Sequence, residues 1–509
     1  MKTTTLALAA MSASLLALGA PAAAHAETAC ADLVKTVLPH AEVTKAVSEK
    51  VGEMAVCKVS VTSRPTKDSD IRMELWIPEG AAWNGKFVQV GNGGFAGTIP
   101  RVSFNAPVKA GYAVAGTDDG HQDPVGTNAS WALGHPEKVV DFGWRAVKET
   151  TDASKALIVA QKGAKASRSY FAGCSDGGRE ALMTAQRYPN DFDGIVAGAP
   201  ANYMSQLFGL SAYQQQLMTK PGGYLGPAQR ELLQKTSLAE CGGEAFIRDP
   251  MSCHFDPRKL ACKAGQTPKP GEEGGCLSAP QVATATALYQ GRKDKTGKIA
   301  FPGYSPGAES ANGSWNAWIT GPNADLNQKA AGPSFSSNAF KYFGFQDPNF
   351  DYLKMDMGAQ FDIAHARMAP IIDSADPNLA AFKKHGGKLI QYHGWNDPAI
   401  PPRSSVVYYE DVRKTMGDTG GFYKLYLIPG MLHCAGGVGP SNVDWVAELD
   451  GWVNGKAAPG ELIAKGGPGQ APGGPASQVL CPFPGVAKKT GESWACAVPM
   501  KNVPMKKKG

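Results

Sequence analysis

The stretch Tyr170-Phe-Ala-Gly-Cys-Ser-Asp-Gly-Gly-Arg179 decides how this chain is interpreted. It contains Gly173-Cys-Ser-Asp-Gly177, which fits G-x-S-x-G, the tight turn that raises a nucleophilic serine above the end of a strand. Both glycines are needed because a side chain there would strike the neighbouring strand or helix. The bare motif also arises by chance in a chain with 60 glycines. Here an apolar strand pattern precedes it and a helical pattern over 179–188 follows it, so Ser175 is a candidate nucleophile.

Predicted strands and helices alternate on both sides of this turn. Strands are predicted over 72–77, 86–90, 112–117, 193–199, 388–392 and 422–428, and helices over 141–162 and 404–414. Alternation of this kind favours an α/β fold with a mostly parallel sheet that helices cover on both faces. Residues 201–376 interrupt the pattern, since they are rich in Gly and Pro and hold four cysteines. We interpret them as an inserted lid domain between the two parts of an α/β-hydrolase domain, residues 27–200 and 377–509.

The first 26 residues have the pattern of a secretory signal peptide. A basic start is followed by an apolar run from Leu6 to Leu18 and by the A-x-A site Ala24-His-Ala26. A membrane anchor is the alternative, but the run is shorter than the roughly 20 residues that a span needs. We expect cleavage after Ala26 and a soluble mature protein in a bacterial periplasm or in the medium.

Charge and cysteine content exclude several other classes of protein. The net charge of +6 is modest, and the one dense basic run, Lys506-Lys-Lys508, ends the chain, so no nucleic-acid partner is expected. Ten cysteines in an exported chain predict disulfides, and none has the spacing of a zinc site. Cys30 with Cys57, and Cys481 with Cys496, are expected to close the two terminal segments.

The glycine-rich segment Gly91-Asn-Gly-Gly-Phe-Ala-Gly97 directly follows the strand predicted over 86–90. A loop in this place can offer backbone N–H groups to an oxyanion, as hydrolases with G-x-S-x-G do. A phosphate-binding loop or a plain turn is the alternative. The segment does not match the Walker pattern, which disfavours phosphate binding.

A serine nucleophile needs a base and an acid that orients the base. In α/β-hydrolases they follow in the order Ser, Asp, His, each just past a strand end. Asp397 and His433 meet both conditions. Other candidates are the acids Asp373 and Asp376, which have no strand before them, and the histidines His121 and His393, which also follow strands.

Two cysteines directly adjoin the proposed nucleophile and base. Cys174 precedes Ser175, and Cys434 follows His433. If the serine and histidine lie within hydrogen-bond reach, roughly 3 Å, their neighbours can lie near the Cα separation of about 5.5–6 Å that a disulfide needs. We therefore predict a Cys174–Cys434 bond; two unpaired core cysteines are the alternative.

These residues together resemble the tannase and feruloyl esterase family, which also includes hydrolases of mono(hydroxyethyl) terephthalate. The resemblance covers essentially the whole mature chain and includes Trp83-Asn-Gly-Lys, Gly91-Asn-Gly-Gly-Phe-Ala-Gly, Asp141-Phe-Gly-Trp-Arg-Ala, Gly173-Cys-Ser-Asp-Gly-Gly-Arg, Tyr392-His-Gly-Trp-Asn-Asp-Pro and Pro429-Gly-Met-Leu-His-Cys. It implies an α/β-hydrolase with an inserted lid that cleaves esters of aromatic acids. It implies Ser175 as nucleophile, His433 as base and Asp397 as orienting acid.

The resemblance also implies further roles and pairings. The oxyanion hole would use the backbone N–H of Asp176 and of Gly93 or Gly94. The implied disulfides are Cys30–Cys57, Cys174–Cys434, Cys241–Cys253, Cys262–Cys276 and Cys481–Cys496. Many members carry an Asp-rich calcium loop between the cysteines that match Cys241 and Cys253, but here Glu244 and Asp249 are its only acids. Because Ca²⁺ prefers six to eight oxygen ligands, we expect no metal there, and the chemistry needs no cofactor.

The lid should supply a pocket for a flat aromatic acid. Candidates for stacking on the ring are Trp315, Trp318, Tyr342, Phe343 and Phe345, and for each of them the alternative is a place in the lid core. We expect a small aromatic ester as substrate and a monomer or homodimer. Three rival functions remain open: a terephthalate half-ester hydrolase, a serine peptidase of the same fold, and an inactive homologue that only binds a ligand.

Overall fold

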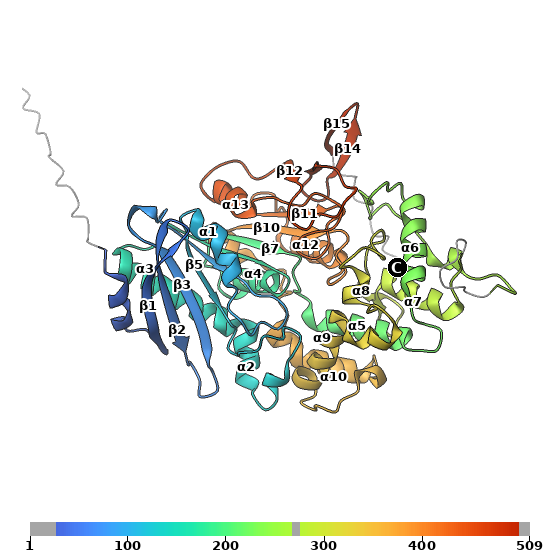
Figure 1. Ribbon diagram of the computed structural model, residues 1–509, viewed down its shortest axis with the longest axis horizontal. Helices are drawn as coiled ribbons and strands as arrows, with labels where there is room; N and C mark the ends of the chain where they lie inside the picture. The colour runs from blue at the N-terminus through green and yellow to red at the C-terminus, as the bar shows by residue number, and fades with distance from the viewer. Residues whose placement is uncertain (1–26, 267–274, 498–509) are drawn as a thin grey trace, which may run out of the picture.

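The computed structural model describes residues 27–266 and 275–497 (Figure 1). The expected signal peptide and the C-terminal lysine run lie outside the described residues. A nine-stranded sheet runs through the molecule in the order β1-β2-β3-β5-β4-β6-β7-β10-β11. Its strands are β1 (Ala41–Val51), β2 (Met54–Ser63), β3 (Ile71–Pro78), β4 (Lys86–Val90), β5 (Ala113–Thr117), β6 (Arg168–Cys174), β7 (Gly194–Gly198), β10 (Lys388–Gly394) and β11 (Tyr423–Ile428).

The sheet has an antiparallel and a parallel part. Strands β1, β2, β3 and β5 pair antiparallel, whereas β5, β4, β6, β7, β10 and β11 pair parallel. From β4 the chain continues to β5 on one side, and it then returns to β6 on the other side. The strand order therefore reverses between β4 and β6, the place where open α/β sheets bind ligands at the carboxyl ends of their strands.

Alternating side chains of the central strands pack into two separate cores. Phe171 and Leu389 lie in the core under α3, α4, α11 and α12, whereas their neighbours Tyr170 and Ile390 lie in the core under α1 and α13. Helices therefore cover both faces of the sheet, as predicted. Their bounds are α1 (Asn105–Lys109), α2 (Pro136–Val140), α3 (Ala146–Lys162), α4 (Asp176–Arg187), α11 (Ala380–His385), α12 (Arg403–Met416) and α13 (Trp445–Val453).

The helix predicted over 141–162 differs at its start. Residues Asp141–Arg145 form a π-helical turn between α2 and α3. A Cβ on Gly143 would lie 2.5 Å from the carbonyl oxygen of Ile371 in α10 (Ala359–Ile372), so the turn is in close contact with that helix. The sequence pattern alone gave no sign of this irregularity.

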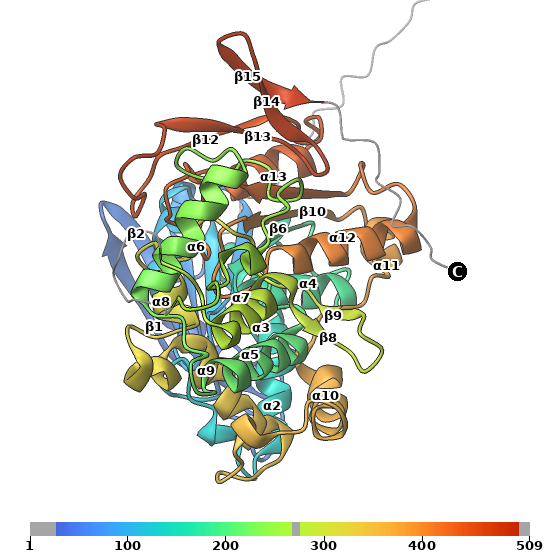
Figure 2. The same cartoon turned by 90° about the vertical axis from the view of Figure 1, so that its right-hand side faces the viewer.

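Residues 201–376 are called the inserted segment below, and their described part, 201–266 and 275–376, adds no strand to the nine-stranded sheet. They form α5 (Met204–Met218), α6 (Pro227–Glu240), α7 (Ala279–Gln290), α8 (Trp315–Trp318), α9 (Ala331–Asn338), α10 (Ala359–Ile372) and the short strands β8 (Arg292–Lys293) and β9 (Ile299–Phe301). Figure 2 shows these helices grouped together, with the C-terminal hairpin β14–β15 projecting beyond the rest of the fold. The C-terminal strands are β12 (Leu462–Lys465), β13 (Ser477–Leu480), β14 (Val486–Thr490) and β15 (Ser493–Ala497).

Five disulfides link residues of the described chain. They pair Cys30–Cys57, Cys174–Cys434, Cys241–Cys253, Cys262–Cys276 and Cys481–Cys496, the same pairs that the family resemblance implied. Four of them close loops of 12 to 27 residues, whereas Cys174–Cys434 spans 260 residues. Among the described residues, none of the helices has the length and apolar character needed to span a bilayer.

Candidate active site

Ser175 stands at a sharp turn between the end of β6 and the first residue of α4. Its backbone is left-handed, with φ 67° and ψ −120°, which is strained for a residue with a side chain. A Cβ on Gly173 would lie 2.4 Å from the Gly177 carbonyl oxygen, and a Cβ on Gly177 would lie 2.8 Å from the Asn92 carbonyl oxygen. The two glycines of the motif are therefore required by close backbone contacts, and the turn leaves the serine hydroxyl at the edge of the sheet.

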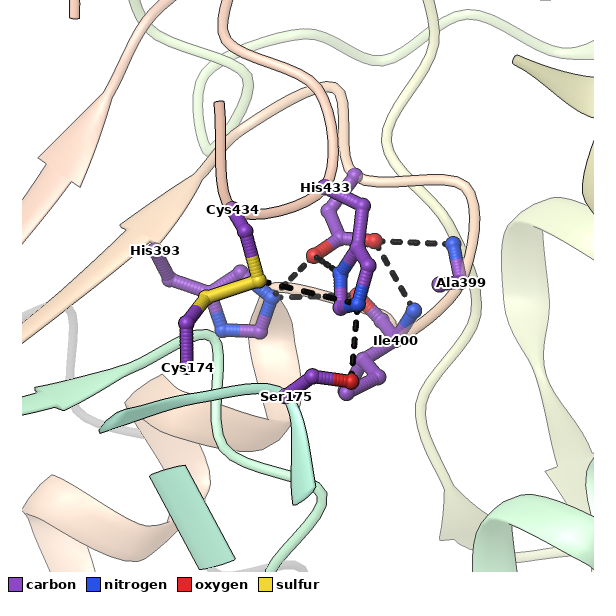
Figure 3. The surroundings of a disulfide bond; sticks show 8 residues. Cys174, Ser175, His393, Ala399, Ile400, His433 and Cys434 are labelled. Carbon is purple, nitrogen blue, oxygen red and sulfur yellow. Dashed lines mark hydrogen bonds and ion pairs between the residues drawn. A yellow bond between two sulfur atoms is a disulfide. The ribbon is translucent and has the colours of Figure 1, made fainter. Parts of the chain in front are cut away.

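Three side chains from separate strand ends form one hydrogen-bonded chain (Figure 3). The Ser175 Oγ lies 2.9 Å from His433 Nε2, and His433 Nδ1 lies 2.7 Å from Asp397 Oδ2. Asp397 follows β10 and His433 follows β11, so the parallel sheet brings both to the edge where Ser175 stands. The structure thus brings together the three residues proposed from the sequence. A histidine with its Nε2 on a hydroxyl and its Nδ1 on a carboxylate is arranged to accept the hydroxyl proton.

The Asp397 carboxylate is buried and receives four hydrogen bonds. Oδ1 accepts the backbone N–H groups of Ala399 and Ile400 at 2.8 and 2.9 Å. Oδ2 faces both His433 and a second histidine, His393, whose Nε2 lies 3.2 Å away. Burial by itself raises the pKa of Asp397, but the two histidines outweigh it and hold that pKa well below its usual value. The carboxylate is therefore ionised at any pH near neutrality.

The disulfide Cys174–Cys434 lies directly against this chain (Figure 3). Its two Cα atoms are 5.9 Å apart, and Cys434 Sγ is 3.7 Å from His433 Nε2. Cys434 itself has a left-handed backbone, with φ 61°. The bond fixes the loop after β11 to the end of β6, so it limits how far the histidine can move from the serine.

The loop after β4 reaches the same edge of the sheet. Gly94 and Asp176 line a cavity beside Ser175, whereas exposed Gly93 does not. Gly94 has φ +63°, and a Cβ on it would lie 2.5 Å from the Gly126 carbonyl oxygen, so no other residue fits without strain. The N–H of Gly177 donates to the Asn92 carbonyl oxygen at 2.8 Å and ties this loop to α4. Of the two glycines proposed for an oxyanion hole, Gly94 is the one placed at the cavity.

The cavity beside Ser175 is mostly apolar and lies against the inserted segment. The Trp318 ring packs on the His433 ring with 5.0 Å between centroids, and the Phe335 ring packs on Phe95 of the glycine-rich loop at 5.0 Å. Other lining residues are Ala201, Met204, Leu207, Phe208, Ser211, Tyr304, Gly332, Ser336, Ala399 and Ile400. Among the residues that the structure describes, no Arg or Lys side chain lines it.

The aromatic residues proposed for the pocket divide into two groups. Trp318 lines the cavity, but Trp315 is buried against Tyr289 in the core of the inserted segment. Phe343 is buried behind the glycine-rich loop, where it packs on Phe95 at 5.1 Å. Tyr342 and Phe345 pack against the same core and, within the described chain, are not among the cavity residues. These four residues, Trp315, Tyr342, Phe343 and Phe345, therefore pack in or against the protein core and do not line the cavity, within the described chain.

Sequence reasoning missed two parts of the site. Phe335, Leu207 and Phe208 reach the cavity from helices whose patterns resemble those of ordinary buried helices, so nothing in the sequence marked them. His393 was considered only as a competing base, although its contact with Asp397 could have been inferred from their close spacing at the end of one strand. Its ring is fully buried and is also 2.7 Å from Ser405 Oγ through Nδ1.

The loop between Cys241 and Cys253 offers few ligands for a cation. Asp249 accepts hydrogen bonds from the Ser252 hydroxyl at 2.6 Å and from the Met251 N–H at 3.2 Å. Its carboxylate is thereby engaged within the turn, and Glu244 is the one other acid of the loop. The donor set does not match the six to eight oxygens that calcium prefers.

Comparisons with known proteins point to one family. The sequence matches the family model described as "Tannase and feruloyl esterase" over residues 57–501. It is 33% identical over 500 residues to an uncharacterized esterase of Xanthomonas campestris, covering 87% of this chain and 84% of that one. It is 30% identical over 412 residues to feruloyl esterase C of Talaromyces stipitatus, covering 78% and 73%.

Two solved structures share the fold. The crystal structure of feruloyl esterase B from Aspergillus oryzae superposes with a TM-score of 0.82 at 25% identity, covering 92% of this chain and 99% of that one. The tannin acyl hydrolase of Aspergillus niger has a TM-score of 0.69 at 22% identity, covers 90% of both chains, and supports the fold alone. The chain therefore has the α/β-hydrolase fold and belongs to the tannase and feruloyl esterase family of carboxylic ester hydrolases.

Proposed function

We propose that this protein is an exported serine esterase that hydrolyses esters of uncharged aromatic acids, of the feruloyl or galloyl type, through an acyl-enzyme. One observation carries the proposal. The Ser175–His433–Asp397 chain opens into a mostly apolar cavity that Gly94 and Asp176 also line. The family description, tannase and feruloyl esterase, and the name of one relative, feruloyl esterase C, support the substrate class.

In the first half-reaction, Ser175 Oγ attacks the ester carbonyl carbon while His433 Nε2 accepts the hydroxyl proton. The bond to the alcohol oxygen then breaks, and the alcohol leaves with the proton that His433 returns. Asp397 stabilises the imidazolium through its bond to Nδ1. The acid remains as an ester of Ser175.

The negative charge that develops on the carbonyl oxygen needs donors in place. The backbone N–H groups of Gly94 and Asp176 are the proposed oxyanion hole, since both residues line the cavity at Ser175. In hydrolases each such donor contributes roughly 3 kcal/mol to catalysis. In the second half-reaction, His433 takes a proton from water, the hydroxide attacks the acyl carbonyl, and Ser175 leaves with the proton.

The lining of the cavity favours uncharged acids over acids with a second carboxylate. A terephthalate half-ester would bring an ionised carboxylate into an apolar site where no Arg or Lys of the described chain lines the cavity, so its desolvation would remain uncompensated. Phenolic hydroxyls can instead pair with the hydroxyls of Tyr304 and Ser211, and Trp318 can stack on a ring. We therefore place feruloyl and galloyl esters above the half-ester.

A substrate panel tests the proposal. We expect kcat/KM for methyl ferulate, methyl gallate or chlorogenate to exceed that for mono(hydroxyethyl) terephthalate at least tenfold. A tenfold ratio corresponds to roughly 1.4 kcal/mol of desolvation free energy that no charged partner compensates. Phenylmethanesulfonyl fluoride should transfer its phenylmethanesulfonyl group to Ser175 Oγ with loss of hydrogen fluoride, and the Ser175→Ala variant should show neither turnover nor labelling. An intact protein that hydrolyses none of these esters, nor p-nitrophenyl acetate, would support the ligand-binding alternative, and cleavage of amides at similar rates would support a peptidase.

Export and metal independence belong to the same proposal. The signal pattern over residues 1–26 and the five disulfides favour an oxidising compartment. Mass spectrometry of the secreted protein should find its first residue at Glu27. Dialysis against EDTA should leave activity unchanged, and loss of activity that calcium restores would overturn the expectation of no metal.

A further inference from the structure

We propose that His393 is a positioning residue for the triad, held neutral with its proton on Nε2 by a buried hydrogen-bond chain that ends at Tyr423. The inference rests on the proposed function, since it assigns a role in orienting Asp397. It starts from Figure 3, in which the His393 ring lies beside the carboxylate that His433 contacts. Asp397 Oδ2 is thus shared by two imidazoles, at 2.7 Å from His433 and 3.2 Å from His393.

The surroundings of Nε2 require a proton there. This nitrogen faces two acceptors, Asp397 Oδ2 at 3.2 Å and the Ile400 carbonyl oxygen at 3.1 Å. Neither oxygen can donate a hydrogen bond. An unprotonated Nε2 would therefore leave three acceptor atoms facing one another, with no hydrogen between them, in a fully buried site. His393 therefore donates from Nε2.

Whether Nδ1 carries a proton follows from the hydrogen bonds that link Ser405 to Gln391 and Tyr423. In the structure the Tyr423 hydroxyl donates to Gln391 Oε1, and Gln391 Nε2 donates to Ser405 Oγ at 2.6 Å. Ser405 accepts that N–H and is left with one hydrogen to donate. Its neighbour at 2.7 Å is His393 Nδ1. The hydroxyl donates to this nitrogen, and the ring is neutral.

The fold makes this chain rigid. Gln391 and His393 are two residues apart on β10 and face the same side, toward α12, which carries Ser405. Tyr423 begins the neighbouring strand β11. All four side chains are fully buried, so no water competes for their hydrogen bonds.

A neutral His393 suits the reaction better than a charged one. Asp397 must accept from His433 Nδ1 and stabilise the imidazolium that forms when Ser175 is deprotonated. A second imidazolium on the same carboxylate oxygen would oppose that charge at short range. A neutral N–H donor orients Oδ2 without this penalty.

The first test measures the tautomer directly and does not depend on activity. The chain has nine histidines, so ¹⁵N-histidine labelling of the intact protein is practical, and the signals lost in His393→Gln identify the ring. We expect His393 to have a protonated Nε2 and an unprotonated Nδ1 at neutral pH. A proton on Nδ1, or a doubly protonated ring at neutral pH, would overturn the proposal.

The second test measures kinetics with methyl ferulate and p-nitrophenyl acetate. His393→Ala should lower kcat about 10²-fold with little change in KM, because Asp397 loses a donor that fixes its direction. His393→Gln keeps an N–H near the position of Nε2 and should recover most of that loss. If a folded His393→Ala variant keeps wild-type kcat, or if His393→Gln is no better than His393→Ala, the proposal is wrong. If the wild type hydrolyses no ester, the proposed function fails, and the tautomer measurement still decides the state of His393.

Two tyrosines of β11 provide a matched pair if His393→Ala does not fold. Tyr423→Phe removes the hydroxyl that fixes the Gln391 amide, whereas Tyr426→Phe removes a buried hydroxyl that donates to the Gly460 carbonyl oxygen, outside the chain. We expect Tyr423→Phe to lower kcat about fivefold, the equivalent of one net hydrogen bond, and Tyr426→Phe to leave it unchanged. Equal effects of the two substitutions on kcat would contradict the inference.

Discussion

The strand-end loops of the sheet and the inserted segment form the two sides of one cavity, but they are built differently. Ser175, Asp397 and His433 each follow a strand of the parallel sheet, and a disulfide joins the first and last of these loops. The inserted segment has a separate apolar core and two disulfides that close loops of 12 and 14 residues within it. The sheet thus holds the proposed catalytic groups, and the inserted segment provides the side of the cavity that we propose contacts the acid.

The two sides are coupled through one aromatic cluster. Phe95, next to Gly94, contacts Phe335 at 5.0 Å and Phe343 at 5.1 Å, both from the inserted segment. A change in the wall therefore reaches the proposed oxyanion loop through a single ring. We therefore expect substitutions on the sheet side to affect kcat, and substitutions in the inserted segment to affect the choice of substrate.

The largest effect that this division predicts is at Asp397. We expect Asp397→Asn to lower kcat about 10⁴-fold, because an amide can leave the His433 ring in the wrong tautomer. Kinetics with p-nitrophenyl acetate would measure the loss, and circular dichroism should show an unchanged fold. An increase in KM with unchanged kcat would contradict a catalytic role for the strand-end residues, since Asp397 would then act on substrate binding.

Removing one disulfide from each side of the cavity should have the next largest effect and should distinguish the two sides. Cys174→Ala with Cys434→Ala should lower kcat about 10²-fold through misplacement of His433, and should lower the free energy of unfolding by about 4 kcal/mol. The matched control is Cys262→Ala with Cys276→Ala, which removes a bond of the inserted segment. That control should keep kcat on p-nitrophenyl acetate. Equal losses of activity from both pairs would contradict a special role for the first bond.

Trp318 tests the wall of the cavity. Trp318→Ala should raise KM for methyl ferulate about tenfold, the equivalent of a lost aromatic contact of roughly 1.4 kcal/mol. Its effect on p-nitrophenyl acetate should be smaller, because the acetyl group leaves the wall empty. Phe345→Ala, which removes an aromatic ring of the same segment that stacks on Phe350 instead, is the control and should change neither value.

The smallest effect concerns a buried acid behind the glycine-rich loop. Burial raises the pKa of Glu180 to about 7, and its Oε2 accepts the Asn92 N–H at 3.1 Å. When a carboxyl group has a higher pKa in the folded than in the unfolded state, the folded protein is most stable below the unfolded pKa. Its free energy of unfolding then falls as the pH rises from the unfolded pKa to the folded one. We therefore expect the free energy of unfolding to fall between about pH 4.5 and pH 7 by on the order of 1 kcal/mol or more.

Glu180→Gln removes this titration. Urea unfolding at pH 5 and pH 8 should show a smaller difference for Glu180→Gln than for the wild type. Glu240→Gln, at an exposed residue, should behave as the wild type does. If Glu180→Gln keeps the full pH dependence, the titrating group lies elsewhere.

Much of the sheet side could be predicted from the sequence because its constraints are local. A strand followed by Gly-x-Ser-x-Gly specifies a turn, and residues just past parallel strands meet at one edge. The extent of the sheet and its mostly parallel order follow from the same alternation. The choice between Gly93 and Gly94 could not be made, since it depends on contact with the distant residue Gly126.

The insertion side could not be predicted to the same depth. Trp315 and Trp318 occur within one short helix, yet the first is buried in the core and the second lines the cavity. Their difference comes from how α8 packs on neighbouring helices, which sequence periodicity over four residues cannot resolve. The same holds for Phe343 and Phe335, which both pack on Phe95, although Phe335 lines the cavity and Phe343 is buried in the core.

The bond between Cys174 and Cys434 has a consequence for how this enzyme can vary. The whole inserted segment lies inside the ring that this bond closes. The covalent path from Ser175 to His433 runs through the two sulfurs, so lengthening or shortening the insertion does not alter it. A protease that cuts once between residues 201 and 376 would still leave nucleophile and base on one molecule.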